Sequence, residues 1–138
     1  MDNNELLQQW LEKSNDDLRS AEYLSTMHYP TPNEVICNLC QQSSEKYLKS
    51  FLFLYDIEPP KTHNLIELME ICVKIDNNFS VLLPQLDVLR IYAVLPRYPN
   101  ELGITNEDMK IAIKYARIVK EFVLKTIGNF SMQEDNGK

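Results

Sequence analysis

Three segments carry side chains that could recognise a phosphorylated ligand. They are residues 41–49 (QQSSEKYLK), residues 61–65 (KTHNL) and residues 97–99 (RYP). Lysine and arginine pair with phosphate, and an aromatic ring stacks on a base. Arg97 offers a planar guanidinium fork beside Tyr98 in a loop that proline stiffens, so we expect this pair to make the most sensitive ligand contact. In the alternative, structural role, the guanidinium satisfies carbonyls at the end of the preceding helix.

The remaining candidates also have an ordinary explanation on a helix. Glu45 and Lys49 stand four residues apart, in the order that favours an ion pair stabilising a helix. Alternatively, a groove in which lysine meets phosphate is lined by Gln42, Glu45, Lys46 and Lys49. His63 stands at the entrance of a helix, where backbone donors receive an anion, or it is part of a plain helix start. We predict Lys46, Lys49 and His63 as lesser ligand contacts.

Apolar residues recur at steps of three and four along five stretches, which predicts the helices that must position these residues. The predicted bounds are residues 5–26, 32–55, 62 or 63 to 75, 81–95 and 105–128. Sustained strand alternation does not occur, and the chain has three glycines. The sequence therefore predicts an all-α fold, an antiparallel up-and-down bundle of about five helices.

Short polar residues mark the expected helix ends. Thr31 and Glu34 fit a capping box at the start of the second helix. Thr62 is the expected cap of the third helix, and Thr105 of the last. Gly128 is the expected end of the last helix, because glycine commonly follows a helix C-terminus.

The composition predicts one domain in residues 1–128 and a flexible tail in residues 129–138. The chain has 14 basic and 20 acidic residues, and its net charge of -6 argues against broad electrostatic binding to nucleic acid or to an anionic membrane. It lacks an apolar run of the roughly 20 residues that cross a membrane, and its polar N-terminus is unlike a signal peptide. We expect a cytoplasmic location and no membrane partner.

The chain has three cysteines, an odd number. Cys37 and Cys40 stand three apart within an apolar helical pattern, and Cys72 lies on the next helix. A second ligand pair that would complete a zinc site is missing from the sequence. We therefore predict buried, reduced thiols with a structural role, no metal and no cofactor.

The order and spacing of the three polar segments resemble the HEPN domain (higher-eukaryote and prokaryote nucleotide-binding), a small helical partner often encoded beside a minimal nucleotidyltransferase. The resemblance covers residues 8–126. It implies a homodimer that binds nucleotide or RNA and pairs with a nucleotidyltransferase subunit in a toxin-antitoxin-like system. The breadth of the apolar surface on the second, fourth and fifth predicted helices also favours a dimer.

The resemblance does not extend to the pattern of the HEPN ribonucleases, in which a histidine follows an arginine after four to six residues. Neither Arg90 nor Arg97 is followed by a histidine at that spacing, because His28 and His63 precede both arginines. We therefore predict a non-catalytic binding module. The alternative is a ribonuclease toxin with a divergent active site, in which Arg97, Tyr98 and His63 have the active roles.

Overall fold

The computed structural model describes the backbone of residues 3–28, 30–94 and 103–136, and the side chains of these residues except 3 and 129–136. Five α-helices and two 3₁₀ turns form this part of the chain, which contains no strand. In chain order they are α1 (Asn3–Leu24), α2 (Asn33–Leu54), α3 (Leu65–Ile75), η1 (Asn77–Leu82), α4 (Leu83–Leu89), η2 (Arg90–Ala93) and α5 (Asn106–Asn136). The prediction of an all-α helical bundle is confirmed.

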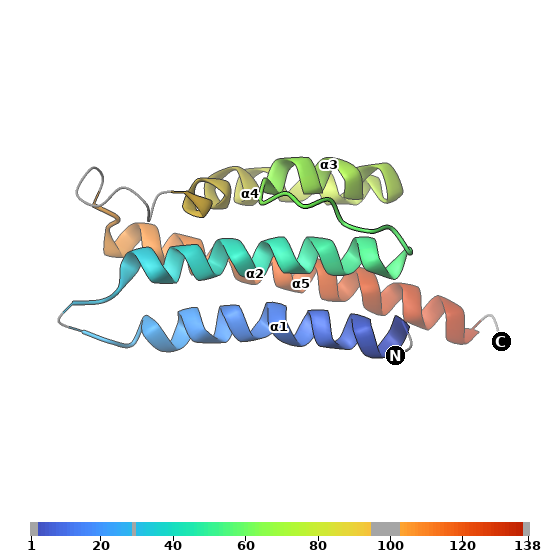
Figure 1. Ribbon diagram of the computed structural model, residues 1–138, viewed down its shortest axis with the longest axis horizontal. Coiled ribbons are helices and arrows are strands. Elements are labelled where there is room, and N and C mark those ends of the chain that lie inside the picture. The colour runs from blue at the N-terminus through green and yellow to red at the C-terminus, as the bar shows by residue number, and fades with distance from the viewer. Residues whose placement is uncertain (1–2, 29, 95–102, 137–138) are drawn as a thin grey trace.

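The helices lie in three layers, with α1 on one side, α2 and α5 in the middle, and α3 and α4 on the other side (Figure 1). The most extensive helix contacts join α2 to α1 and to α5. Because α2 has neighbours on both sides, most of its second half is buried, including polar positions. Polar side chains within α2 must therefore find partners inside the protein.

Small side chains let α1 and α2 pack closely. Ser14 and Ser43 are fully buried in this contact, and the Ser43 hydroxyl donates to the backbone oxygen of Ser14 at 2.8 Å. The Ser14 hydroxyl donates to the backbone oxygen of Trp10 at 2.7 Å. Both hydroxyls thus have a backbone partner, so the close approach leaves neither of them unsatisfied.

Aromatic rings connect the middle layer to the third layer. The ring centroids of Phe51 on α2 and Phe79 on η1 lie 4.3 Å apart, and Phe79 lies 4.9 Å from Phe122 on α5 in an edge-to-face arrangement. Phe51 and Phe79 are fully buried. These rings fix η1 against α2 and α5, because aromatic pairs add to the free energy gained from burial alone.

The connection between α2 and α3, residues 55–64, doubles back along the last turns of α2 (Figure 1). It leaves α2 through Asp56, which has φ of 56°, and through two backbone bonds, from Asp56 N to Phe53 O and from Ile57 N to Leu52 O, both at 3.0 Å. This hydrogen-bond pattern is a Schellman motif. Because of the return, α3 runs in the same direction as α2, and residues 61–63 lie beside the middle of α2.

Two predicted helix starts are wrong in detail. The Thr31 hydroxyl donates to the backbone oxygen of Met27, and α2 begins without a side-chain cap. Asn64, rather than Thr62, caps α3, and its side-chain oxygen accepts from the backbone of Ile66 and Glu67. Thr62 lies two residues before this cap, and its hydroxyl donates to the carboxylate of Glu67 at 3.0 Å.

The cap predicted at Thr105 is correct. Its hydroxyl accepts from the backbone N–H of Asp108, and the Asp108 carboxylate accepts from the backbone N–H of Thr105, both at 3.0 Å. The predicted end at Gly128 is wrong, because α5 continues to Asn136. A single glycine weakens a helix by about 1 kcal/mol, and the next eight residues include no proline.

The fourth predicted helix, residues 81–95, is divided into η1, α4 and η2 over the part that the structure describes. The buried residues Phe79, Leu82, Leu86, Leu89 and Tyr92 follow steps of three, four, three and three. A 3₁₀ turn has three residues per turn, so it keeps residues three apart on one side. The 3₁₀ geometry of η1 and η2 therefore matches the steps of three at both ends of the segment.

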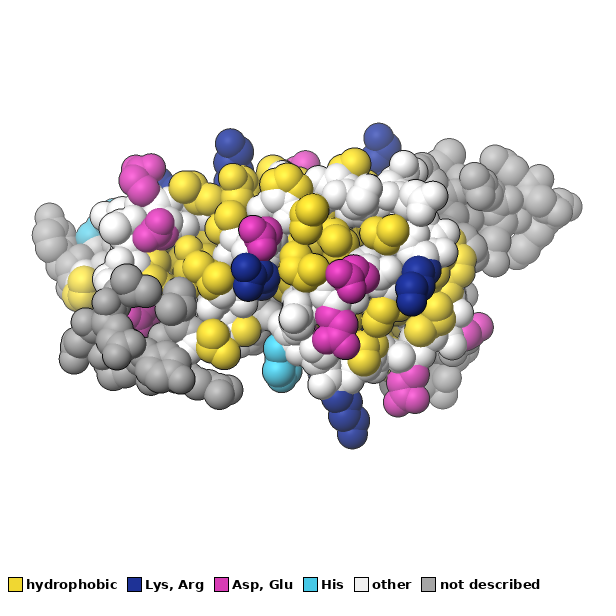
Figure 2. All heavy atoms as spheres, turned by 90° about the horizontal axis from the view of Figure 1, so that it is seen from above, with side chains coloured by type: hydrophobic (Ala, Val, Ile, Leu, Met, Phe, Trp, Pro, Cys, Tyr) yellow, Lys and Arg dark blue, Asp and Glu magenta, His cyan; other side chains and the backbone are white. Residues whose placement is uncertain are grey.

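Hydrophobic side chains are spread over the face that α3 and α4 form (Figure 2). Four exposed hydrophobic residues lie in η1, α4 and η2 and directly after η2, each between 40% and 60% exposed: Val81, Leu83, Ile91 and Val94. Among the described residues, no helix is long and apolar enough to cross a membrane.

Candidate ligand-binding site

The structure brings three of the five predicted site residues to one face of the bundle. Lys46 and Lys49 lie on α2, and His63 lies at the end of the returning connection. Arg97 and Tyr98, for which we predicted the most sensitive contact, lie outside the described residues. Their role stays a prediction.

Glu45 organises this face. Its carboxylate accepts from Gln41 Nε2 at 3.2 Å and Lys49 Nζ at 3.1 Å, and lies 2.9 Å from His63 Nδ1. Gln41 Nε2 also donates to the backbone oxygen of His63 at 3.2 Å. The side chain of Glu45 is 10% exposed, whereas that of His63 is 80% exposed. A buried carboxylate therefore holds an exposed imidazole in place.

The contact with Glu45 determines which ring nitrogen of His63 carries the proton. A carboxylate accepts hydrogen bonds, so Nδ1 is the donor, and Nε2 of the neutral ring is the acceptor. Nε2 can therefore accept a hydrogen bond from a ligand. Protonation would turn this acceptor into a donor and add a positive charge.

The two lysines of this face already have carboxylate partners. Lys49 pairs with Glu45 and is only 12% exposed on its side chain. Lys46 Nζ lies 2.5 Å from a carboxylate oxygen of Asp17 on α1, and both side chains are partly exposed. The two ion pairs leave the face without net charge while His63 is neutral. In a chain with a net charge of -6, such a face is less repulsive to an anion than the average surface.

A polar hollow of about 500 Å³ lies beside these residues. It is lined by Asn38, Gln41, Gln42, Glu45, Lys46, His63 and Ala93. Gln42 Nε2 donates to Asn38 Oδ1 at 2.5 Å, and Asn38 Nδ2 donates to the backbone oxygen of Tyr92 at 3.0 Å. The amides are thus held in fixed orientations by one another and by η2, as a site for hydrogen-bonded recognition requires.

Part of this arrangement is visible in the spacing of residues along the sequence. Gln41, Glu45 and Lys49 are spaced by four, which places them on one face of α2. The sequence analysis predicts the Glu45 and Lys49 pair and includes Gln41 in a candidate segment, but it predicts neither the contacts of Gln41 with Glu45 and His63 nor the part of Asn38 in the hollow. The contact between Glu45 and His63 depends on the path of residues 55–64, which helical periodicity does not predict.

The cysteines form no part of the site. Cys37, Cys40 and Cys72 are free and buried, as predicted. Burial raises the pKa of the Cys37 thiol to about 12, against the opposing effect of a hydrogen bond with Tyr92. Burial likewise raises the pKa of Cys72 to about 12 and that of Cys40 further still. Neutral buried thiols are poor nucleophiles and poor metal ligands.

Comparison with known proteins places this geometry in a family. The model of the HEPN domain matches residues 7–127. The crystal structure of an archaeal HEPN homologue is similar, with a TM-score of 0.69 and 24% identity over 88% of this chain and 97% of that chain. None of the curated proteins matches the chain. Because the family match spans most of the sequence, the chain belongs to the HEPN domain family.

Proposed function

We propose that this HEPN protein is a non-catalytic module that binds nucleotide or RNA in the polar hollow on α2. The observation that carries the proposal is the set of oriented amides around an exposed histidine, with Lys46 at the rim. Proteins that recognise unpaired nucleotides stack bases on flat side chains and bond their edges with amides. His63 supplies the flat ring, and Gln42 and Asn38 supply the amides.

The charges around the hollow favour binding over catalysis. Lys46 and Lys49 are each paired with a carboxylate, so the hollow concentrates little positive charge on a reacting phosphate. The arginine and histidine spacing of the HEPN ribonucleases is also missing from the sequence. We expect Arg97 and Tyr98 to add the guanidinium and the second ring that complete ligand recognition.

The proposal extends to partners and location. We propose a homodimer whose contact includes the exposed apolar residues Val81, Leu83 and Ile91. We further propose a cytoplasmic nucleotidyltransferase subunit as the second partner, in a toxin-antitoxin-like pair. Sedimentation of the pure protein at micromolar concentration tests the first proposal. Co-purification with a nucleotidyltransferase encoded beside the gene tests the second.

A titration with a panel of nucleotides and short RNAs tests the binding site. We expect saturable shifts in the backbone amide resonances of residues 38–46 and of His63. Lys46→Met should weaken binding about tenfold, because a hydrogen bond to a charged group is lost. Lys74→Met is the matched control, since Lys74 is exposed in the last turn of α3, about 14 Å along that helix from its start.

If the parent and the Lys46→Met variant bind the nucleotide or RNA with equal affinity, Lys46 is not a ligand contact. Shifts confined to other faces, or no binding of any nucleotide or RNA, would refute the location of the site. Arg97→Ala extends the same test to the predicted contact outside the described residues. We expect this variant to bind the ligand more weakly than the parent and to keep the thermal stability of the parent.

The pairing of His63 with Glu45 favours a second candidate function. A carboxylate that orients an imidazole is a common arrangement for proton transfer, so a ribonuclease with a divergent active site is the alternative. Cleavage of RNA by the pure protein, abolished in His63→Ala, would establish it. Cleavage that persists unchanged in His63→Ala would point to a contaminant.

A further inference from the structure

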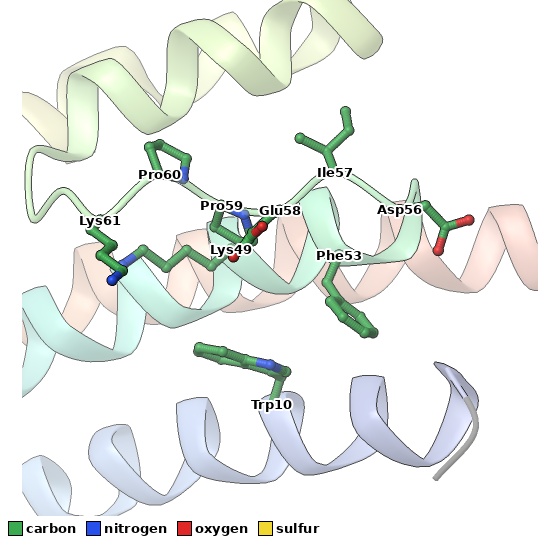
Figure 3. A pocket seen from close by; sticks show the side chains of 9 residues that line it. All are labelled: Trp10, Lys49, Phe53, Asp56, Ile57, Glu58, Pro59, Pro60 and Lys61. Atoms are coloured by element: carbon green, nitrogen blue, oxygen red, sulfur yellow. The ribbon is translucent and has the colours of Figure 1, made fainter.

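A second hollow lies between α1, the end of α2 and the returning connection (Figure 3). Its volume is about 540 Å³, within the range of small-molecule sites. Trp10 from α1 and Phe53 from α2 point into it, and Pro59 and Pro60 line the side formed by the connection. These rigid apolar surfaces suit a flat apolar group, since a stiff wall loses little conformational entropy on binding.

The charges of this hollow are arranged unevenly. The side chains of Lys49 and Lys61 converge at one end, and the carboxylate of Asp56 points away from them at the other (Figure 3). Lys49 Nζ forms an ion pair with Glu45 Oε2 at 3.1 Å. Lys61 is exposed and forms no ion pair within the part of the chain that the structure describes. The ammonium group of Lys61 is therefore available to a ligand.

The acidic residues limit the ligand further. Asp56 lies at the end away from the lysines, and Glu58 also lines the hollow, so a second negative group on the ligand would meet like charge. A ligand that fits both the rings and the charges has a flat aromatic body and one acidic group at a single end.

We propose that this hollow binds a small aromatic carboxylate. The ring system lies against Trp10 and Phe53, and the carboxylate meets Lys61, with Lys49 as a second partner. This proposal goes beyond the nucleotide or RNA site, because the two hollows are lined by different residues on the two sides of the Glu45 and Lys49 ion pair.

The ion pair connects the two hollows. Glu45 lines the first hollow and Lys49 lines the second. A carboxylate that contacts Lys49 competes with Glu45 for the same ammonium, and Glu45 in turn holds His63. Binding in the aromatic hollow should therefore change the environment of the His63 ring as well.

The single tryptophan makes the test direct, because the one indole N–H resonance of the protein belongs to Trp10. The probes are 2-naphthoate and its uncharged analogue 2-naphthylmethanol. We expect 2-naphthoate to shift the indole resonance saturably and to move the His63 ring signals. In Lys61→Met its affinity should fall about two- to fivefold, as expected for one exposed charge pair.

Controls distinguish the contribution of the Trp10 ring to binding from that of the Lys61 charge. Lys74→Met should bind 2-naphthoate like the parent, and 2-naphthylmethanol should bind the parent and Lys61→Met equally. Trp10→Leu, followed by calorimetry, should weaken both probes about two- to tenfold, because the stacking partner is lost. Failure of 2-naphthoate to shift the indole resonance at millimolar concentration, or equal affinity in Lys61→Met and Lys74→Met, would overturn the proposal, whatever the outcome of the nucleotide titration.

Discussion

Replacing Glu45 by glutamine should destabilise the protein through Lys49 rather than through His63. The substitution keeps the size of the side chain and removes its charge. Lys49 is then left with an uncompensated charge on a side chain that is 12% exposed. His63 is 80% exposed on its side chain, so water replaces its lost partner at little cost.

The expected magnitude follows from this burial. Removing one partner of a fully buried ion pair costs about 3–5 kcal/mol. The ammonium of Lys49 retains some contact with water at the end of a flexible stem, which lowers the expected loss to about 2–3 kcal/mol. For a chain of this size, that loss corresponds to a fall in Tm of roughly 8–12 °C.

Urea denaturation followed by circular dichroism, in a double-mutant cycle, measures this effect. Lys49→Met should restore most of the stability when combined with Glu45→Gln, because it removes the orphaned charge and keeps the aliphatic stem. Asp87→Asn is the matched control, since it breaks the exposed ion pair with Arg90 and should cost under about 1 kcal/mol. The reasoning fails if Glu45→Gln is as stable as the parent, or if Lys49→Met restores nothing.

Two further predictions concern stability. The thiols of Cys37, Cys40 and Cys72 ionise near pH 9 in an unfolded chain, and burial raises their pKa in the folded one, to about 12 for Cys37 and Cys72. Their contribution to the free energy of unfolding is therefore complete below pH 9 and declines above it, because the unfolded chain loses the thiol protons first. At pH 10 the loss of stability is about 4 kcal/mol for three thiols. The urea midpoint should therefore fall between pH 8 and 10, and it should fall less in a variant with all three cysteines replaced by alanine. Both Asp56→Val and Asp56→Gly remove the carboxylate, but only valine is strained at φ of 56°, because it is β-branched. In urea denaturation Asp56→Val should therefore cost about 1–2 kcal/mol more than Asp56→Gly, and equal losses would contradict this explanation.

The long helices could be predicted from the sequence because their apolar residues repeat over many turns. The predicted bounds of the first two helices differ from α1 and α2 by at most two residues at each end. The division of the fourth predicted helix into η1, α4 and η2 could not be predicted, since nearly every position between 81 and 95 is apolar or aromatic enough to satisfy several periods. Burial at steps of three, seen at Phe79 and Leu82, is visible only in the folded chain.

The geometry of the candidate site was predictable where it depends on one helix and unpredictable where it depends on two segments. The positions of Lys46 and Lys49 on α2 follow from helical periodicity, and the ion pair between Lys49 and Glu45 follows from their spacing of four. The ion pair between Lys46 and Asp17 requires α1 and α2 to meet in a particular register. The bond from Glu45 to His63 likewise requires residues 55–64 to return along α2, which depends on the turn at Asp56.

The buried position of Glu45 supports the proposal that this face binds a ligand. It is buried in the central helix of the bundle, where an apolar residue would pack without a desolvation cost. Well-packed apolar replacements of buried ion pairs are often neutral or stabilising, so Glu45 and Lys49 are poorly explained by stability alone. Local departures from the apolar pattern of a core are expected at functional sites. Here the two charged residues lie between two hollows, one lined by amides and one by aromatic rings. Glu45 lines the first hollow and Lys49 lines the second.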